Sequence, residues 1–119
     1  MAARGNRRTA ECATVDWGQL ARYTFDSPVL EREIIDLFLQ QLPLIVARLK
    51  AAREETAWRL AVHTLKGSAA AVGAAQINAI AAGLEELGFA GDRASRAEVV
   101  AALELAISLY QKAVDPLSV

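Results

Sequence analysis

The residues best suited to chemistry in this 119-residue chain surround its single histidine, His63. Lys66 follows three positions later and Gly67 four, and the segment continues in small side chains as HTLKGSAAAVG. On a helix, residues three and four positions apart are neighbours on one face, so the lysine ammonium would lie beside the imidazole. A neutral imidazole nitrogen is a nucleophile near neutral pH, and a lysine offsets the negative charge of a phosphoryl group. These residue types at this spacing favour phosphoryl chemistry at His63.

A helical wheel places the imidazole away from the apolar face of its own segment. The apolar side chains fall about 160° to 240° from His63 at ~100° per residue; they are Trp58, Ala61, Leu65, Ala69 and Val72. Gly67 costs ~1 kcal/mol relative to alanine inside a helix, which makes sense where something large must approach the ring. We therefore predict that His63 points into solvent along an open path. The alternative is an incidental surface histidine. The residues near it on the wheel are Arg59, Leu60, Lys66, Gly67, Ala70 and Ala71.

Capping signals mark where the first helices begin. Asp16 can cap a helix start, and Gln19 three residues later completes a capping-box pattern, so we expect a short helix there. Ser27 followed by Pro28 is a second start, because a hydroxyl caps the helix and proline fits its first turn. From Pro28 a long helical segment is predicted to run to about Ala52.

Glycines and a third capping pattern divide the remainder of the chain. The helix that contains His63 is predicted to stop near Gly73, and the next one, over residues 74–87, to end at Gly88. The stretch Ser95–Glu98 reads as a capping box that opens a final helix, with Pro116 beyond its end.

The helical segments predict an all-α protein. No stretch alternates like a strand, and four amphipathic helices joined by short turns bury their apolar faces by running antiparallel. The predicted fold is an up-and-down antiparallel four-helix bundle with a short additional N-terminal helix, formed by residues 15–119 behind a flexible tail, residues 1–14. Pro43 is expected to bend the long helix. The predicted inward faces are Ile34, Phe38, Leu42, Ile45 and Leu49; Ile77, Ile80, Ala81, Leu84 and Leu87; and Val99, Leu103, Ala106, Ile107 and Tyr110.

The long helix also carries a second apolar line, formed by Leu30, Leu37 and Leu44 at a spacing of seven residues. Two interpretations are open, and they can hold for different residues of the line. Such a line can be a docking patch for a partner. It can also pack against the short first helix with its nearby apolar residues, and this second interpretation is favoured.

Composition excludes several classes of protein. Apolar residues make up 54% of the chain and charged residues 23%, which is typical of a globular protein. A formal net charge of −1 gives no general attraction to nucleic acid or to anionic membranes. A single cysteine, Cys12, excludes an internal disulfide, and one histidine with one cysteine makes no metal site. No apolar run suggests a signal peptide or a membrane span, so we expect a cytoplasmic monomer.

The segment HTLKGSAAAVG resembles the signature of histidine-containing phosphotransfer (HPt) domains, roughly His-x-Leu-Lys-Gly followed by small residues. The resemblance implies that His63 accepts a phosphoryl group from an aspartate of a response-regulator receiver domain and later returns it to another receiver. Lys66 would stabilise the phosphate charge, and Gly67 would leave room for the docking receiver. In some members a glutamine or glutamate on the next helix orients the imidazole. Glu85 is the candidate here, against the equally open alternative of a solvated charge, and Gln76 and Asn78 are weaker candidates.

The resemblance also implies a division of labour with partners. The receiver would bring the Mg²⁺ and the acidic pocket, so no cofactor is expected on this chain. A hybrid histidine kinase would be the other partner. Because the chain has no phosphate loop and no kinase motif, it would be a relay component without autonomous ATP-dependent turnover, and whether it counts as an enzyme is partly convention. Receiver docking is predicted to use Arg59, Leu60, Ala70 and Ala71.

Two other functions compete with this interpretation. In the first, the bundle is a phosphorylation-independent interaction module that binds a receiver or a kinase, and the histidine is inert. In the second, it is the dimerisation domain of a histidine kinase. That class typically places an acidic residue after its histidine, where this chain has Thr64, and it continues into an ATP-binding domain. The second alternative is therefore disfavoured.

Overall fold

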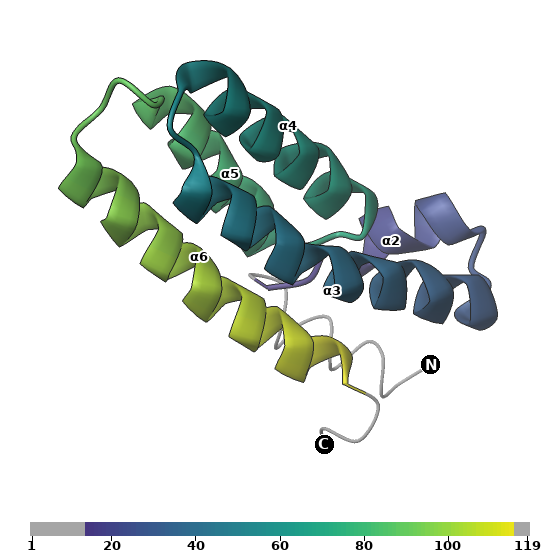
Figure 1. Ribbon diagram of the computed structural model, residues 1–119. Coiled ribbons are helices and arrows are strands. Elements are labelled where there is room, and N and C mark those ends of the chain that lie inside the picture. Colours follow the sequence, from purple (N-terminus) through teal and green to yellow (C-terminus); the bar gives the residue numbers. More distant parts are fainter. Residues whose placement is uncertain (1–13, 116–119) are drawn as a thin grey trace.

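Residues 14–115 are described by the computed structural model, and this part of the chain is helical with no strand (Figure 1). Helix α2 is short, and the four longer helices that follow are joined by brief turns. The bounds are α2 Trp17–Thr24, α3 Pro28–Ala51, α4 Glu55–Ala71, α5 Ala75–Leu87 and α6 Arg93–Val114. The predicted tail, residues 1–14 with Cys12, lies outside the described residues except for Thr14, and so does Pro116.

The four long helices form an antiparallel bundle. The α3–α4 and α5–α6 connections lie at one end of it and the α4–α5 connection at the other (Figure 1). Packing runs around the ring from α3 to α4, α4 to α5, α5 to α6 and back to α3, while α2 packs against α3 and α4. The molecule is accordingly elongated, about 46 × 22 × 22 Å. The predicted up-and-down four-helix bundle with an extra N-terminal helix is confirmed.

Two of the predicted helix starts are confirmed by their caps. The Asp16 carboxylate accepts a hydrogen bond from the Gln19 N–H at 3.0 Å, and the Ser27 hydroxyl oxygen accepts one from the Leu30 N–H at 3.2 Å. The second half of the capping-box pattern is different, because the Gln19 side chain accepts a hydrogen bond from Arg22 in the next turn of the helix. Each cap satisfies a backbone donor that the first helical turn leaves without a partner.

The final helix begins earlier than predicted. It starts at Arg93 after Asp92, and the Ser95 hydroxyl donates to the Asp92 carboxylate at 3.4 Å instead of capping a backbone N–H. Asp92 thus stands at the N-cap, and its carbonyl accepts a hydrogen bond from the Arg96 N–H at 2.9 Å. The Arg96 guanidinium donates to the carbonyls of the preceding loop and lies 4.4 Å from the ring centroid of Phe89. These contacts hold the loop against the first turn of α6.

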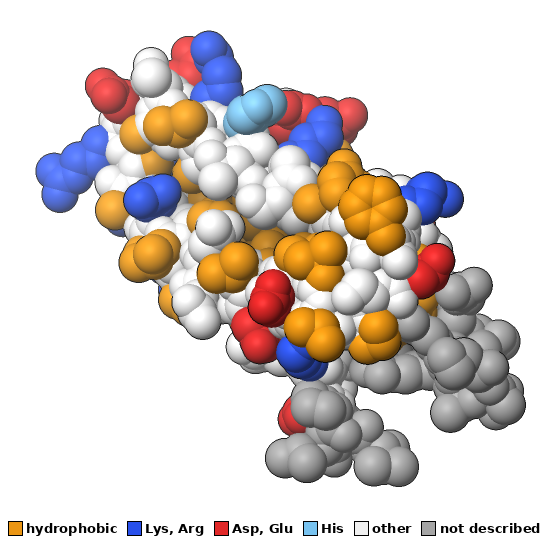
Figure 2. Space-filling model, turned by 90° about the vertical axis from the view of Figure 1, so that its right-hand side faces the viewer, with side chains coloured by type: hydrophobic (Ala, Val, Ile, Leu, Met, Phe, Trp, Pro, Cys, Tyr) orange, Lys and Arg blue, Asp and Glu red, His pale blue; other side chains and the backbone are white. Residues whose placement is uncertain are grey.

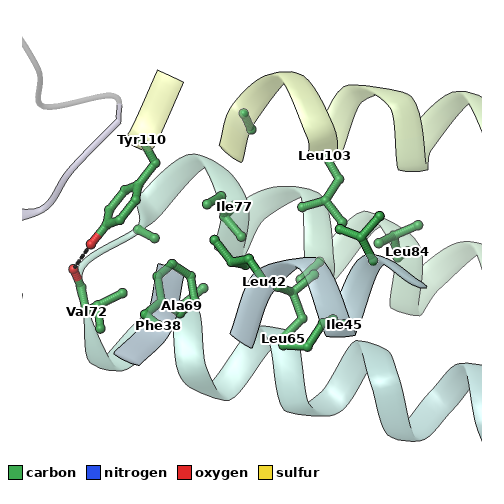
Figure 3. Close-up of a cluster of buried hydrophobic side chains, with 14 of the residues drawn as sticks. Phe38, Leu42, Ile45, Leu65, Ala69, Val72, Ile77, Leu84, Leu103 and Tyr110 are labelled. Carbon is green, nitrogen blue, oxygen red and sulfur yellow. Dashed lines mark hydrogen bonds between the residues drawn. The ribbon is translucent and has the colours of Figure 1, made fainter. Parts of the chain in front are cut away.

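The core lies along the bundle axis and draws on all four long helices (Figure 3). Most of the predicted inward residues are buried, but the buried faces of α3 and α6 are rotated slightly from the predicted ones. Ile34 and Val99 are half-buried, whereas their neighbours Ile35 and Val100 are buried. A helix in a bundle touches two neighbours, so its buried face is centred between them. Ile80, Leu87 and Ile107 are also only partly buried.

A buried tyrosine ties the last helix to the end of α4. The Tyr110 hydroxyl donates to the Val72 carbonyl at 3.2 Å, and its ring meets Phe38 edge-on with centroids 5.5 Å apart (Figure 3). Burial raises the pKa of Tyr110 well above its usual range, so the hydroxyl keeps its proton and remains a donor. This hydrogen bond fixes the α4–α5 turn against α6.

The second apolar line of α3 is mostly exposed. Leu37 and Leu44 have 57% and 59% of their surface exposed, and Leu30 is half-buried. The favoured prediction, packing against the first helix, is therefore wrong for Leu37 and Leu44. The reason is the placement of α2, which turns Trp17 and Leu20 inward and leaves Tyr23 in solvent. Helix α3 runs on through Pro43. Among the described residues, no helix is long and apolar enough to cross a bilayer.

Candidate functional site

Helix α4 presents the histidine on its outer side. Its buried residues include Trp58, Ala61, Leu65 and Ala69, which the helical wheel assigns to the core, and also Val62, which the wheel does not assign. The His63 side chain is exposed, as predicted, and stands out on the surface of the bundle (Figure 2). Within residues 14–115 neither ring nitrogen has a hydrogen-bond partner. Both nitrogens are therefore open to an approaching group.

Lys66 lies one turn beyond His63 and forms an ion pair across to α5. Its Nζ donates to Oε1 of Glu85 at 2.9 Å, and the two side chains are 41% and 48% exposed. Glu85 therefore contacts the lysine that the sequence assigns to the phosphate. A role for Glu85 in orienting the imidazole stays a prediction.

Helix α5 also holds the backbone of Lys66. The Asn78 side-chain amide donates to the Lys66 carbonyl at 2.9 Å, from a partly buried position. Asn78 and Glu85 are seven residues apart, which places them two turns apart on one side of α5. Gln76, the other weak candidate for orienting the imidazole, has its side-chain oxygen buried without a hydrogen-bond partner among the described residues.

Gly67 leaves bare surface beside the lysine. It is exposed, and a Cβ built on it would meet no atom within 4 Å. Packing therefore does not require a glycine here, although a glycine weakens the helix interior. Ala70 is exposed and Ala71 half-buried on the following turn, so only short side chains cover the surface beyond Gly67.

The residues before His63 are also accessible. Arg59 pairs with Glu55 at 2.6 Å within the helix, and these side chains are 69% and 66% exposed. Leu60 is 65% exposed, which is high for a leucine. All four predicted docking positions, Arg59, Leu60, Ala70 and Ala71, thus lie wholly or partly at the surface.

A depression flanks the exposed ridge of α4 on each side. One, of about 520 Å³, lies between α4 and the end of α3, and Leu60 and Thr64 line it. The other, of about 280 Å³, lies between α4 and α5, and Arg59, Val62 and Glu85 are among its lining residues. Hydrophobic side chains gather on the face that carries the imidazole (Figure 2). The histidine stands on a ridge between two grooves.

Comparison with known families decides which class of protein uses this arrangement. The family model described as Hpt domain matches residues 33–113, more than half of the chain. The chain belongs to the Hpt domain family. Hpt domains serve histidine phosphotransfer in phosphorelays, in which they interact with receiver domains. Neither the curated proteins nor the solved structures compared with the chain gave a match.

Sequence reasoning misses how this Hpt domain holds its lysine. It offers Asn78 and Glu85 as partners of the imidazole, with a solvated charge as the alternative for Glu85, whereas both residues contact Lys66. Their seven-residue spacing is a usable signal, since it places two polar side chains on one side of α5. In residues 14–115 no three histidine, cysteine, aspartate or glutamate side chains gather where they could hold a metal ion.

Proposed function

We propose that this Hpt domain is an intermediate of a phosphorelay that carries the phosphoryl group on His63. The observation that carries the proposal is the exposed imidazole with both nitrogens free, on a helix that carries Lys66 one turn further along. The donor would be the aspartyl phosphate of one receiver domain and the acceptor the aspartate of another. A hybrid histidine kinase is the expected source of the first phosphoryl group.

The transfer step needs only a nucleophile from this chain. A neutral ring nitrogen of His63 attacks phosphorus, the N–P bond forms, and the P–O bond to the receiver breaks, releasing the aspartate as a carboxylate. The other ring nitrogen keeps its proton, so the phosphorylated ring is formally a cation that bears a dianionic group. The reverse reaction hands the group to the next receiver. Mg²⁺ bound to the receiver would offset charge on its side of the transferred group.

Lys66 and Gly67 would serve the same step in different ways. The lysine ammonium compensates negative charge as it spreads over the transferring oxygens. The bare surface at Gly67 lets a receiver loop approach the ring, because in-line transfer requires close contact between the two proteins. Both roles are proposals that rest on position and exposure.

The docking face is proposed to follow the α4 ridge and its α3 flank. Arg59 and Leu60 precede the histidine, Ala70 and Ala71 follow it, and the exposed Leu44 of α3 adds apolar surface. Interfaces of transient complexes combine an apolar centre with a polar rim. The charged residues around the grooves would form such a rim.

The relay function is tested with two receiver domains. One is phosphorylated with a labelled small phosphodonor and freed of excess reagent, and the second is unphosphorylated. We expect label to reach the second receiver only when this Hpt domain is present, with a labelled Hpt intermediate on the way. Binding of both receivers without movement of label would contradict the proposal and favour the phosphorylation-independent interaction module.

A further inference from the structure

The lysine of the site is held at two points by the neighbouring helix. Asn78 binds its carbonyl and Glu85 binds its ammonium, at 2.9 Å each. We infer that Glu85 is a positioning residue that competes with the phosphoryl group for Lys66 and so lowers the stability of the phosphohistidine. This inference rests on the proposed function, because it concerns the strength with which the same site holds its phosphoryl group.

The contact between Lys66 and Glu85 is of the kind that exchanges easily. Both side chains are about half exposed, and water screens such surface pairs so that they contribute little to stability. A phosphoryl group carries close to two negative charges against one on Glu85, and it offers three strong acceptor oxygens. The ammonium would therefore turn from Glu85 to the phosphoryl group when His63 is modified.

Asn78 confines this exchange to the lysine side chain. Its hydrogen bond fixes the Lys66 carbonyl, so the backbone of α4 keeps its place while the four-carbon stem changes direction. His63 and Lys66 are neighbours on one helical face, three residues apart. The ammonium can thus reach either the ring substituent or Glu85 without movement of the helices.

The exchange leaves a carboxylate without its partner beside a dianion. Glu85 would then repel the phosphoryl group and compete for the same ammonium. Both effects destabilise the phosphorylated state relative to the free state, whereas the receiver's own aspartyl phosphate is unaffected. The equilibrium is thereby tilted toward release of the group, which suits a carrier that must pass it on.

Neutralising Glu85 tests the inference through the transfer equilibrium. Glu85→Gln keeps the shape of the side chain and removes its charge, so we expect the equilibrium constant for transfer from a phosphorylated receiver to rise about threefold. The shift should shrink at high salt because the charges are exposed. Glu86→Gln is the matched control: it makes the same change of net charge at an exposed neighbour that has no ion pair to Lys66.

The route through Lys66 is tested with a double-mutant cycle. In a Lys66→Met background, Glu85→Gln should shift the equilibrium clearly less than in the unaltered protein, since there is no ammonium to compete for. An equal shift in both backgrounds, or no difference between Glu85→Gln and Glu86→Gln, would overturn the inference while leaving the relay function intact. Failure of the unaltered protein to take up label would instead overturn the proposed function. Thermal unfolding of each variant checks that the bundle is preserved.

Discussion

At the scale of single residues, the proposed site separates nucleophile, charge compensation and access. In the proposal His63 supplies the nitrogen, Lys66 the cation, and Gly67 the bare surface next to them. None of these side chains is needed by the core, because the buried face of α4 lies on its other side. Their types are therefore explained by what approaches the helix from outside.

Gly67 yields a prediction that separates stability from transfer. Gly67→Ala adds a methyl group that meets no atom within 4 Å, so it should raise the free energy of unfolding by about 1 kcal/mol through helix propensity alone. Gly67→Leu should also keep the fold but slow transfer from a phosphorylated receiver by at least about tenfold, because its side chain fills the approach to the ring. Chemical denaturation and the rate of labelling measure the two effects. A leucine variant with a normal transfer rate would show that access at Gly67 is unimportant.

At the scale of elements, the turn between α4 and α5 contacts the residue that precedes α2, Asp16. Gly73 has a φ of +68°, its carbonyl accepts a hydrogen bond from the Asp16 N–H at 2.6 Å, and a Cβ on it would lie 2.3 Å from the Asp16 carbonyl oxygen. The glycine is thus required both by the backbone conformation and by the closeness of another backbone segment. This contact holds the start of α2 against the end of α4.

Two glycines with a positive φ allow that contact to be measured. Gly88 has a φ of +67° and a ψ of 170°, a combination essentially confined to glycine, but a Cβ added to it would meet no atom within 4 Å, so Gly88→Ala should cost only the backbone penalty, about 2 kcal/mol. Gly73→Ala should cost about 4 kcal/mol, because displacement of the Asp16 backbone is added to the cost of a positive φ. The difference in the free energy of unfolding, from chemical denaturation, reports the contact. Equal losses in the free energy of unfolding at the two positions would show that Asp16 moves aside without cost.

The sequence predicted the features that are determined by residues close together in the chain, and it missed those that depend on packing between distant segments. The caps at Asp16 and Ser27 and the outward direction of His63 are set by neighbours within one or two turns, and local patterns predict them. The contacts of Arg96 depend on how the loop before α6 folds back, and the Lys66–Glu85 pair depends on the relative rotation of two helices. The periodicity of one segment contains no information about its rotation against another. The exposure of Leu37 likewise depended on where α2 packs.

At the scale of the whole molecule, the proposed site lies on one side of the bundle. Helix α4 carries it, α3 and α5 flank it with grooves, and α6 packs against α3 and α5. The helix farthest from the site, α6, contributes Tyr110 and Leu103 to the core and so holds the other three in place. Substitutions on the outer surface of α6 should therefore leave the binding of a partner at His63 unchanged.

Two equally exposed leucines test whether partner binding is confined to the α4 side of the bundle. Leu60 on α4 and Leu105 on α6 are 65% and 64% exposed. Leu60→Glu should weaken binding of a receiver domain by about tenfold or more, as expected for a central apolar contact, and Leu105→Glu should leave binding unchanged. Titration calorimetry with one receiver provides both dissociation constants. Equal losses, or a loss only at Leu105, would place the interface elsewhere.

The central claim, that the exposed imidazole of His63 is the phosphoryl acceptor, is tested most directly by locating the label after incubation with a phosphorylated receiver. We predict a single labelled residue, His63, with the acid-labile and alkali-stable bond of a phosphoramidate, and no label on a His63→Gln variant that keeps its helical signal. Label that persists in His63→Gln, or a bond that survives acid and breaks in alkali, would contradict the account.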